Sequence, residues 1–120
     1  MVTNRGPGAV PLQADQIIGE YVRAAKAMAP HADYLMLNLS CPNTVDGRDF
    51  FADAGHLQAC LAALGEVKLR PPVFLKVSPL GGIEVIERVL TAADGRDFVS
   101  GFMFNLPPVK PEGMRTPEHL

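Results

Sequence analysis

The chain has 120 residues, of which 48% are hydrophobic and 20% are charged, a balance typical of one globular domain rather than a disordered segment. Its formal net charge of -2 and the lack of a Lys/Arg run argue against a nucleic-acid-binding surface. No apolar stretch approaches the roughly 18 residues of a membrane span, and the start "MVTNRGPGAVPLQ" has no apolar segment of a signal peptide. We therefore expect a cytoplasmic protein.

The first half of the chain predicts a loop, a helix and a strand. Residues 1–13 carry glycines and prolines without a periodic pattern, which indicates a loop. Asp15 is suited to cap a helix that ends at Pro30, because apolar residues recur there at three- and four-residue spacing: Ile17, Ile18, Tyr21, Val22, Ala25 and Met28. The segment "DYLMLN", residues 33–38, is apolar on both faces and too short for a helix, so it predicts a buried strand.

The second half repeats this alternation. Asp53 can cap a helix that ends near Gly65 and carries one apolar stripe, formed by Leu57, Cys60, Leu61 and Leu64. After a second buried strand, "PVFLKVS", a third helix is expected from about Gly82 to Ala93, with Ile83, Val85, Ile86, Val89 and Leu90 on one face. The segment "DFVSGFMFN" then predicts a third strand, in which Gly101 indicates close packing, and residues 106–120 are expected to form a loop or tail.

Polar residues stand at the ends of all three predicted strands. Helices that alternate with apolar strands predict an α/β fold with a parallel sheet. Asn38 ends the first strand, Lys76 comes just before the end of the second, and Asn105 ends the third. Because ligands bind at the carboxyl edge of such sheets, the pattern predicts a site there.

Each of these residues also has a simpler interpretation. A lysine in an apolar strand needs an anionic or hydrogen-bonding partner, unless it extends to water from an edge strand or pairs with a carboxylate. Asn38 and Asn105 could cap backbone groups, and Asn43, which follows Pro42, fits an ordinary turn. Because all three predicted strands carry a polar residue at or near the carboxyl end, we favour a ligand-binding role for these residues.

The two cysteines differ in their surroundings. They lack the CxxC spacing of a metal site, and nothing points to export, so we expect free thiols. Cys41 follows a strand end, where a thiol with a pKa of about 8.5 could remove a proton. A single cysteine is more often a small buried hydrophobic residue, and Cys60 on the helical stripe fits that description. His31 and His56 are expected to be structural or solvated.

The segments "ADYLMLNLSCPNT", "RDF", "PVFLKVSP" and "GFMFN" together resemble the dihydroorotate dehydrogenases in order and spacing, from about Asp15 to Asn105. The element N-x-S-C/S-P-N is that family's active-site loop. At the end of the resembling region, the segment "NLPPVKPEG", residues 105–113, departs from the Asn-Thr pair often found in membrane-associated members of the family. The resemblance implies a β/α barrel that holds FMN at the carboxyl ends of its strands and oxidises dihydroorotate to orotate in pyrimidine synthesis.

The resemblance also implies a role for each polar residue. Cys41 would be the base that removes the proton from C5, while hydride passes from C6 to flavin N5. Asn38, Asn43 and Asn105 would bind the substrate, with Asn38 also near the flavin. Lys76 would lie beside the flavin and favour the negative charge of its reduced ring. No metal is implied.

The electron acceptor stays open between a quinone, fumarate and NAD. Cysteine at position 41 is typical of the soluble class 1 members, whereas "NTVDGRDF" resembles the loop of the quinone-linked class 2 members. A quinone-linked protein would be associated with the membrane.

The length predicts a partial (β/α)8 TIM barrel of about three β/α units, because a complete barrel takes about 250 residues. We expect a central segment of the barrel that lacks the phosphate-binding loops for FMN. Unpaired sheet edges would favour association with another chain, including a homo-oligomer. The alternatives are an inactive remnant that serves as an interaction module, and a small phosphometabolite-binding α/β domain.

Overall fold

The computed structural model describes residues 13–39, 50–105 and Gly113. Within them the chain forms three parallel strands, each preceded by a helix. The helices are α1 (Ala14–Met28), α2 (Ala54–Glu66) and α3 (Ile83–Ala93), and the strands are β1 (Leu35–Asn38), β2 (Val73–Val77) and β3 (Val99–Phe104). Short 3-10 turns occupy Ala29–His31, Phe50–Ala52 and Pro79–Gly81. The predicted α/β fold is confirmed, and its order of elements is that of a segment of a (β/α)8 barrel.

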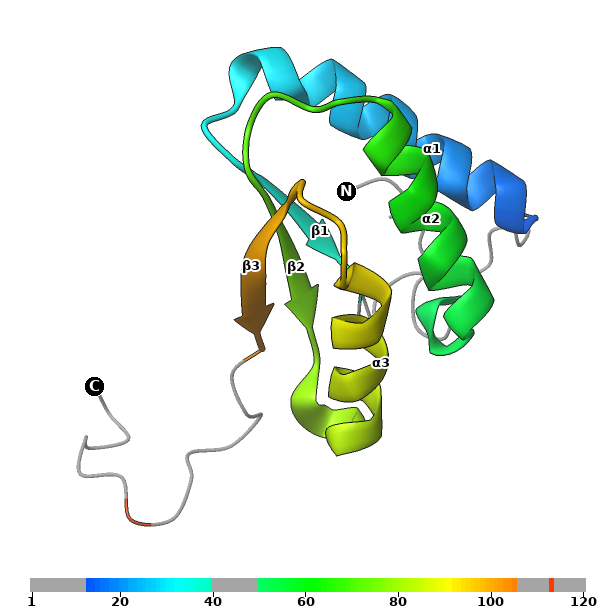
Figure 1. Cartoon of the computed structure of the whole chain (residues 1–120), viewed down its shortest axis with the longest axis vertical. Coiled ribbons are helices and arrows are strands. Elements are labelled where there is room, and N and C mark those ends of the chain that lie inside the picture. Colours follow the sequence, from blue (N-terminus) through cyan, green and yellow to red (C-terminus); the bar gives the residue numbers. More distant parts are fainter. Residues whose placement is uncertain (1–12, 40–49, 106–112, 114–120) are drawn as a thin grey trace, which may run out of the picture.

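The sheet has the order β1-β2-β3, and the helices lie on one side of it (Figure 1). Along each strand side chains alternate between the two faces. Leu35, Leu37, Val73, Leu75 and Val77 point to the helices and are buried. Their neighbours Met36, Asn38, Phe74 and Lys76 lie on the opposite face, which we call the open face, and are half-buried. The expectation of strands buried on both faces is therefore correct only for the helix-covered side of β1 and β2, because β3 contains no buried residue.

The start of α1 differs from the prediction. Its N-cap is Gln13 rather than Asp15, and the Gln16 side-chain oxygen accepts a hydrogen bond from the Gln13 backbone N–H at 2.8 Å. Asp15 lies in the first turn instead, where a carboxylate faces the positive end of the helix dipole. α1 buries Ile17, Tyr21 and Ala25, as the spacing predicts.

The cap of α2 is as predicted. The Asp53 carboxylate accepts hydrogen bonds from the backbone N–H groups of Gly55 at 2.7 Å and His56 at 3.2 Å. The hydrogen bond from His56, and to a smaller extent the one from Gly55, hold the pKa of Asp53 below its usual value. The helix buries its predicted stripe of Leu57, Cys60, Leu61 and Leu64, which forms the centre of the core.

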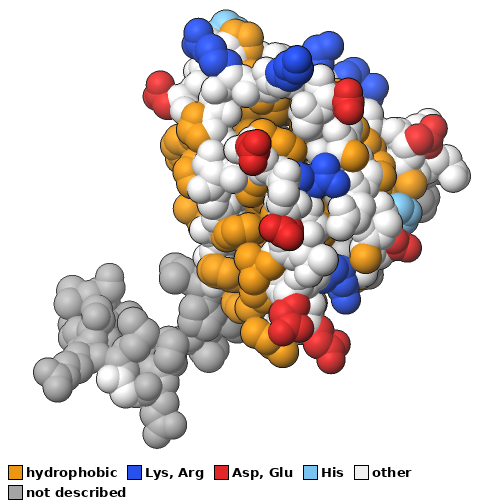
Figure 2. Space-filling model, in the orientation of Figure 1, with side chains coloured by type: hydrophobic (Ala, Val, Ile, Leu, Met, Phe, Trp, Pro, Cys, Tyr) orange, Lys and Arg blue, Asp and Glu red, His pale blue; other side chains and the backbone are white. Residues whose placement is uncertain are grey.

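Three apolar side chains of the predicted helical faces are exposed instead of buried. Met28 of α1 is 54% exposed, and Ile83 and Leu90 of α3 are 65% and 46% exposed. Figure 2 shows hydrophobic side chains at the surface on the side of the molecule that includes α3. Met28 lies beside the edge of β1, where no described element covers it. Periodicity identified the apolar faces correctly, but it overestimated how much of each is covered.

Gly101 marks a close approach, as the sequence predicts. It pairs with Phe74 across β2 and β3, next to an irregularity in the register between Val73 and Phe74. A Cβ atom at Gly101 would lie 3.1 Å from two carbons of the Phe74 ring. A side chain there would push the ring away, so glycine lets β3 pack against β2 at this point.

Candidate functional site

Two of the predicted polar residues are direct neighbours at the carboxyl edge of the sheet. Asn38 of β1 pairs in register with Lys76 of β2, and Lys76 pairs with Met103 of β3. Adjacent strands are about 4.8 Å apart. The third residue, Asn105, follows β3 and donates its backbone N–H to the Val77 carbonyl at 3.1 Å. The structure therefore brings Asn38, Lys76 and Asn105 to one edge.

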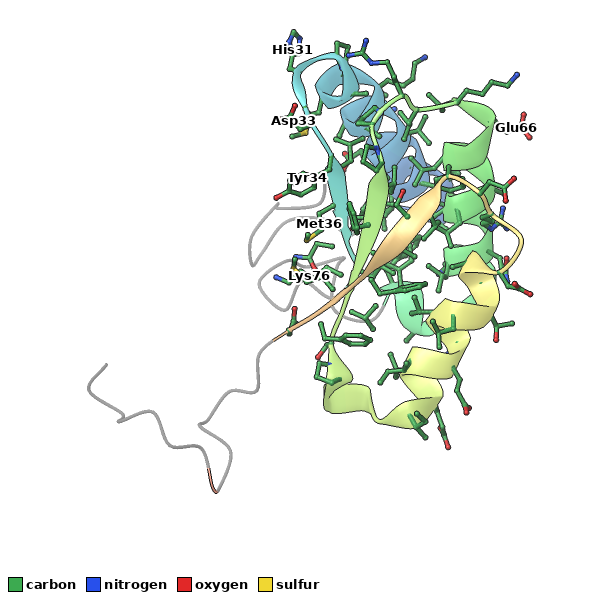
Figure 3. The ribbon with its side chains drawn as sticks, turned by 60° about the vertical axis from the view of Figure 1, so that its left-hand side comes forward. His31, Asp33, Tyr34, Met36, Glu66 and Lys76 are labelled. Atoms are coloured by element: carbon green, nitrogen blue, oxygen red, sulfur yellow. The ribbon has the colours of Figure 1, made fainter. Side chains whose placement is uncertain are left out.

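The side chain of Lys76 lies on the open face. Figure 3 shows Lys76 and Met36 on the side of the sheet that faces away from the helices. Within residues 13–39 and 50–105, no carboxylate oxygen lies within 4 Å of the Lys76 ammonium group, so no ion pair is present there to neutralise it. A half-buried cation beside the apolar side chains of Phe74 and Met103 is suited to an anionic or electron-rich ligand.

The end of β1 is fixed by two hydrogen bonds from different elements. The Tyr21 hydroxyl on α1 donates to the Asn38 carbonyl at 2.9 Å. The backbone N–H of Leu39 donates to the Lys76 carbonyl at 3.1 Å. Both bonds act on the same peptide unit. The first one was not predictable from the sequence, where Tyr21 is only a member of an apolar stripe.

Cys41 and Asn43, the other two predicted site residues, lie outside the described residues. Buried residues lie close to both ends of this segment: Leu39 directly before it is 7% exposed, and Phe51, the second residue after it, is also 7% exposed. The Phe51 ring packs edge-on against the Tyr21 ring, with 5.4 Å between ring centroids. Both flanks of residues 40–49 therefore contact α1 through Tyr21.

An aromatic cluster that the sequence analysis missed surrounds the second flank. The rings of Phe50 and His56 stack with 4.3 Å between centroids and 9° between planes, and His56 Nδ1 lies 3.0 Å from the Phe50 carbonyl oxygen. Phe50 also packs edge-on against Phe51. The adjacent aromatic pair in "RDFF", followed by a histidine six residues after the first ring, was the available signal. These contacts give His56 a structural role.

Cys60 is separate from the polar edge. It is 1% exposed within the core, it is a free thiol, and burial raises its pKa to about 12. Its predicted role as a small buried hydrophobic residue agrees with this position. In the described part of the chain, no three His, Cys, Asp or Glu side chains gather as metal ligands. That part also contains no helix long and apolar enough to span a bilayer.

A groove of about 220 Å³ lies beside the polar edge, between α1 and β1. Apolar side chains dominate its lining, and it reaches the polar edge only at Asn38; the other lining residues include Tyr21, Met28, Tyr34 and Met36. Lys76 and Asn105 do not line it. The candidate site among the described residues is therefore an open sheet edge, and the groove is a separate feature.

Known proteins with similar sequences share most of this chain. The sequence model of the dihydroorotate dehydrogenase family matches residues 9–104. A dihydroorotate dehydrogenase (quinone) from Sphingopyxis alaskensis is 36% identical over 107 residues, which cover 87% of this chain and 30% of the relative. One from Kineococcus radiotolerans is 30% identical over 122 residues, which cover 98% of this chain and 32% of the relative. One from Erythrobacter litoralis is 43% identical over 68 residues, which cover 55% of this chain and 20% of the relative. The chain thus spans at most about a third of the length of these relatives, and no solved structure gives a significant match.

Proposed function

The chain belongs to the dihydroorotate dehydrogenase family, and we propose that it supplies the middle part of an FMN-dependent barrel enzyme that oxidises dihydroorotate to orotate in pyrimidine biosynthesis. The observation that carries this proposal is the meeting of Asn38, Lys76 and Asn105 at one carboxyl edge. These are the positions that the family resemblance assigns to substrate and flavin. Because the chain spans only part of its relatives, the activity belongs to the protein that contains this whole barrel.

The chemistry of the open face fits a flavin. Met36, Phe74 and Met103 offer apolar surface to a flat ring, and the Lys76 ammonium group has no carboxylate partner within 4 Å among the described residues. FMN, when bound, would accept the hydride from C6 of dihydroorotate. Lys76 would stabilise negative charge that develops next to it, because a cation held in place needs little reorganisation as that charge forms. This favours a catalytic role for Lys76 over simple extension to water.

The asparagines suit a polar, planar substrate. Each side-chain amide offers two donors and an acceptor, which match the ring amides and the carboxylate of dihydroorotate. Asn38 sits beside Lys76 in register, so we assign it to both the substrate and the flavin. Asn105 approaches from the next strand and is assigned to the substrate.

The proton acceptor in this proposal is Cys41, supported by the family resemblance of "NLSCPN". A thiol near neutral pH can be deprotonated and take the proton from C5. Asn43, two residues on, is assigned to the substrate on the same grounds. The support from the structure is indirect. Leu39 and Phe51, which lie close to the two ends of the segment that contains Cys41 and Asn43, are buried.

A quinone is the electron acceptor that we propose, because the similar relatives bear the name dihydroorotate dehydrogenase (quinone). Fumarate and NAD are the alternatives, since the cysteine at position 41 is typical of class 1 members. Turnover of the purified enzyme with a soluble quinone, fumarate and NAD separates the three. Reduction of fumarate or NAD at a higher kcat/KM than the quinone would contradict the assignment.

The decisive experiment is expression of this sequence together with its flanking coding sequence. We expect a yellow protein whose flavin absorbance is bleached by dihydroorotate under anaerobic conditions. The 120-residue chain, expressed alone in parallel, should bind FMN weakly, because other parts of a barrel contribute to flavin binding. A longer protein that carries no flavin would refute the proposal and favour the remnant or interaction module.

A further inference from the structure

We propose that Tyr21 is a positioning residue for Asn38, a role that rests on the function proposed above. Tyr21 belongs to α1 and is 6% exposed, and its hydroxyl donates a 2.9 Å hydrogen bond to the backbone carbonyl of Asn38. α1 lies on the side of the sheet that the helices cover, whereas Lys76 lies on the open face (Figures 1 and 3). Tyr21 therefore does not belong to the polar edge, but it contacts the backbone of a residue that does.

The geometry of one peptide unit gives this contact its effect. The Asn38 carbonyl and the Leu39 N–H belong to the same planar group. The carbonyl accepts from Tyr21 of α1, and the N–H donates to the Lys76 carbonyl of β2 at 3.1 Å. Rotation of this plane would break both bonds. Because the same plane contains the Asn38 Cα atom, the two bonds hold the backbone from which the Asn38 side chain extends in place beside Lys76.

Tyr21 also contacts the chain beyond residues 40–49. Its ring meets the Phe51 ring edge-on, with 5.4 Å between centroids and 78° between planes. One side chain thus contacts the chain on both flanks of that segment. The ring contact and the hydroxyl contact can be separated, because phenylalanine at position 21 retains the first and removes the second.

A buried tyrosine commonly satisfies its hydroxyl with a nearby carbonyl, so packing alone could account for the bond. A packing role and a positioning role predict different results. If Tyr21 only packs, Tyr21→Phe lowers the melting temperature and leaves ligand binding by the folded protein unchanged. If Tyr21 positions Asn38, the variant weakens substrate binding well below the melting temperature while FMN remains bound.

The test compares wild type, Tyr21→Phe and Tyr34→Phe in the flavin-loaded protein that contains this sequence. Tyr34 is the matched control, because it is the other tyrosine of the chain and its side chain is 56% exposed. Orotate affinity is measured from the change in the flavin spectrum, and amide hydrogen exchange is measured at Leu39 and at Asn105. Melting temperature and FMN content are recorded for each protein.

We expect Tyr21→Phe to speed Leu39 exchange and to weaken orotate binding, each on the order of tenfold, which corresponds to the loss of one buried hydrogen bond. Exchange at Asn105, whose N–H is bound by Val77, should stay at the wild-type rate. Tyr34→Phe should change neither measurement. FMN content should be equal in all three proteins.

Two results would overturn the inference. Equal Leu39 exchange in wild type and Tyr21→Phe would mean that the hydroxyl does not restrain this peptide. Faster Leu39 exchange with unchanged orotate affinity would leave Tyr21 a purely structural residue. Failure of the proposed function itself would be recognised by a wild-type protein that contains no flavin. In that case, Leu39 exchange would still test the peptide restraint, because this measurement needs no cofactor.

Discussion

Alkaline pH should destabilise the folded protein through Cys60. Burial raises the pKa of this thiol from 9.0 to about 12. Above pH 9.0 the unfolded chain loses the thiol proton while the folded chain keeps it, so the folded state binds more protons and its stability falls as pH rises. The contribution is fully present below pH 9.0 and is lost as pH approaches about 12.

The size of this effect follows from the difference between the two pKa values. Each pH unit in that interval costs about 1.36 kcal/mol, so the free energy of unfolding should be about 2 kcal/mol lower at pH 10.5 than at pH 7, and about 4 kcal/mol lower near pH 12. The same difference makes the thiolate of folded Cys60 about a thousandfold rarer than that of an unperturbed cysteine at pH 8.

Urea unfolding of wild type and Cys60→Ala between pH 7 and pH 10.5 measures the effect. The alanine variant loses packing at every pH, so the informative quantity is how the difference between the two proteins changes with pH. Titrations of Lys and Tyr are common to both proteins and cancel. Parallel stability profiles would refute the reasoning, and so would rapid alkylation of Cys60 in the native protein at pH 8.

Three further predictions concern the site and its supports. Lys76→Met should slow flavin reduction by dihydroorotate at least about a hundredfold, measured by stopped flow, and its free energy of unfolding in urea should stay within about 1 kcal/mol of the wild-type value. An unchanged reduction rate would mean that Lys76 has no catalytic role. Cys41→Ala should abolish flavin reduction with FMN still bound, whereas Cys41→Ser should retain slower turnover with a more alkaline pH profile, because a hydroxyl is the weaker acid; an unshifted profile would contradict Cys41 as the base. Asp53→Ala should lower the melting temperature at neutral pH, and because the pKa of Asp53 is depressed in the folded state, this difference should shrink as pH falls below about 3.8; a constant difference in thermal melts would argue against the cap.

Local signals predicted the elements well. The Asp53 cap, the buried stripe of α2 and the three strands all depend on residues within one turn or one strand, so the sequence shows them directly. The start of α1 was wrong because two local rules compete there. An acid near a helix start can cap the helix or face its dipole from the first turn, and Asp15 does the second while Gln13 and Gln16 form the cap.

Coverage of apolar faces could not be predicted from spacing. Periodicity shows which side of a helix is apolar, but what lies against that side depends on the neighbouring elements. Met28 lies beside the outer edge of β1. Phe102 and Phe104 on β3 are 37% and 47% exposed and belong to the opposite edge of the sheet. A longer barrel would place further elements along both edges, and the exposed residues stand where those elements would pack.

The edge of the candidate site was predictable for a different reason. Parallel strands all end at the same edge, so polar residues at three strand ends must lie near one another whatever the details of packing. The contacts of Tyr21 with Asn38 and Phe51 were not predictable, because they join residues far apart in the sequence and depend on where α1 lies over the sheet. The position of Cys41 and Asn43 relative to this edge stays a prediction.

The middle strand explains why chemistry and positioning can be tested separately in this site. Lys76 and Val77 of β2 accept hydrogen bonds from Leu39 and Asn105 through backbone carbonyls, so β2 sets the positions of both neighbouring strand ends without using a side chain. A substitution at Lys76 removes the ammonium group and retains the carbonyl, so it should change reactivity and leave Asn38 in place. A substitution at Tyr21 has the opposite character, because it releases the Asn38 peptide and leaves the ammonium group untouched. The two variants should therefore differ in kind: Lys76→Met should lower the reduction rate at saturating dihydroorotate, and Tyr21→Phe should act mainly on ligand affinity. Equal effects of both variants on both quantities would mean that the strand ends are not fixed by the backbone of β2.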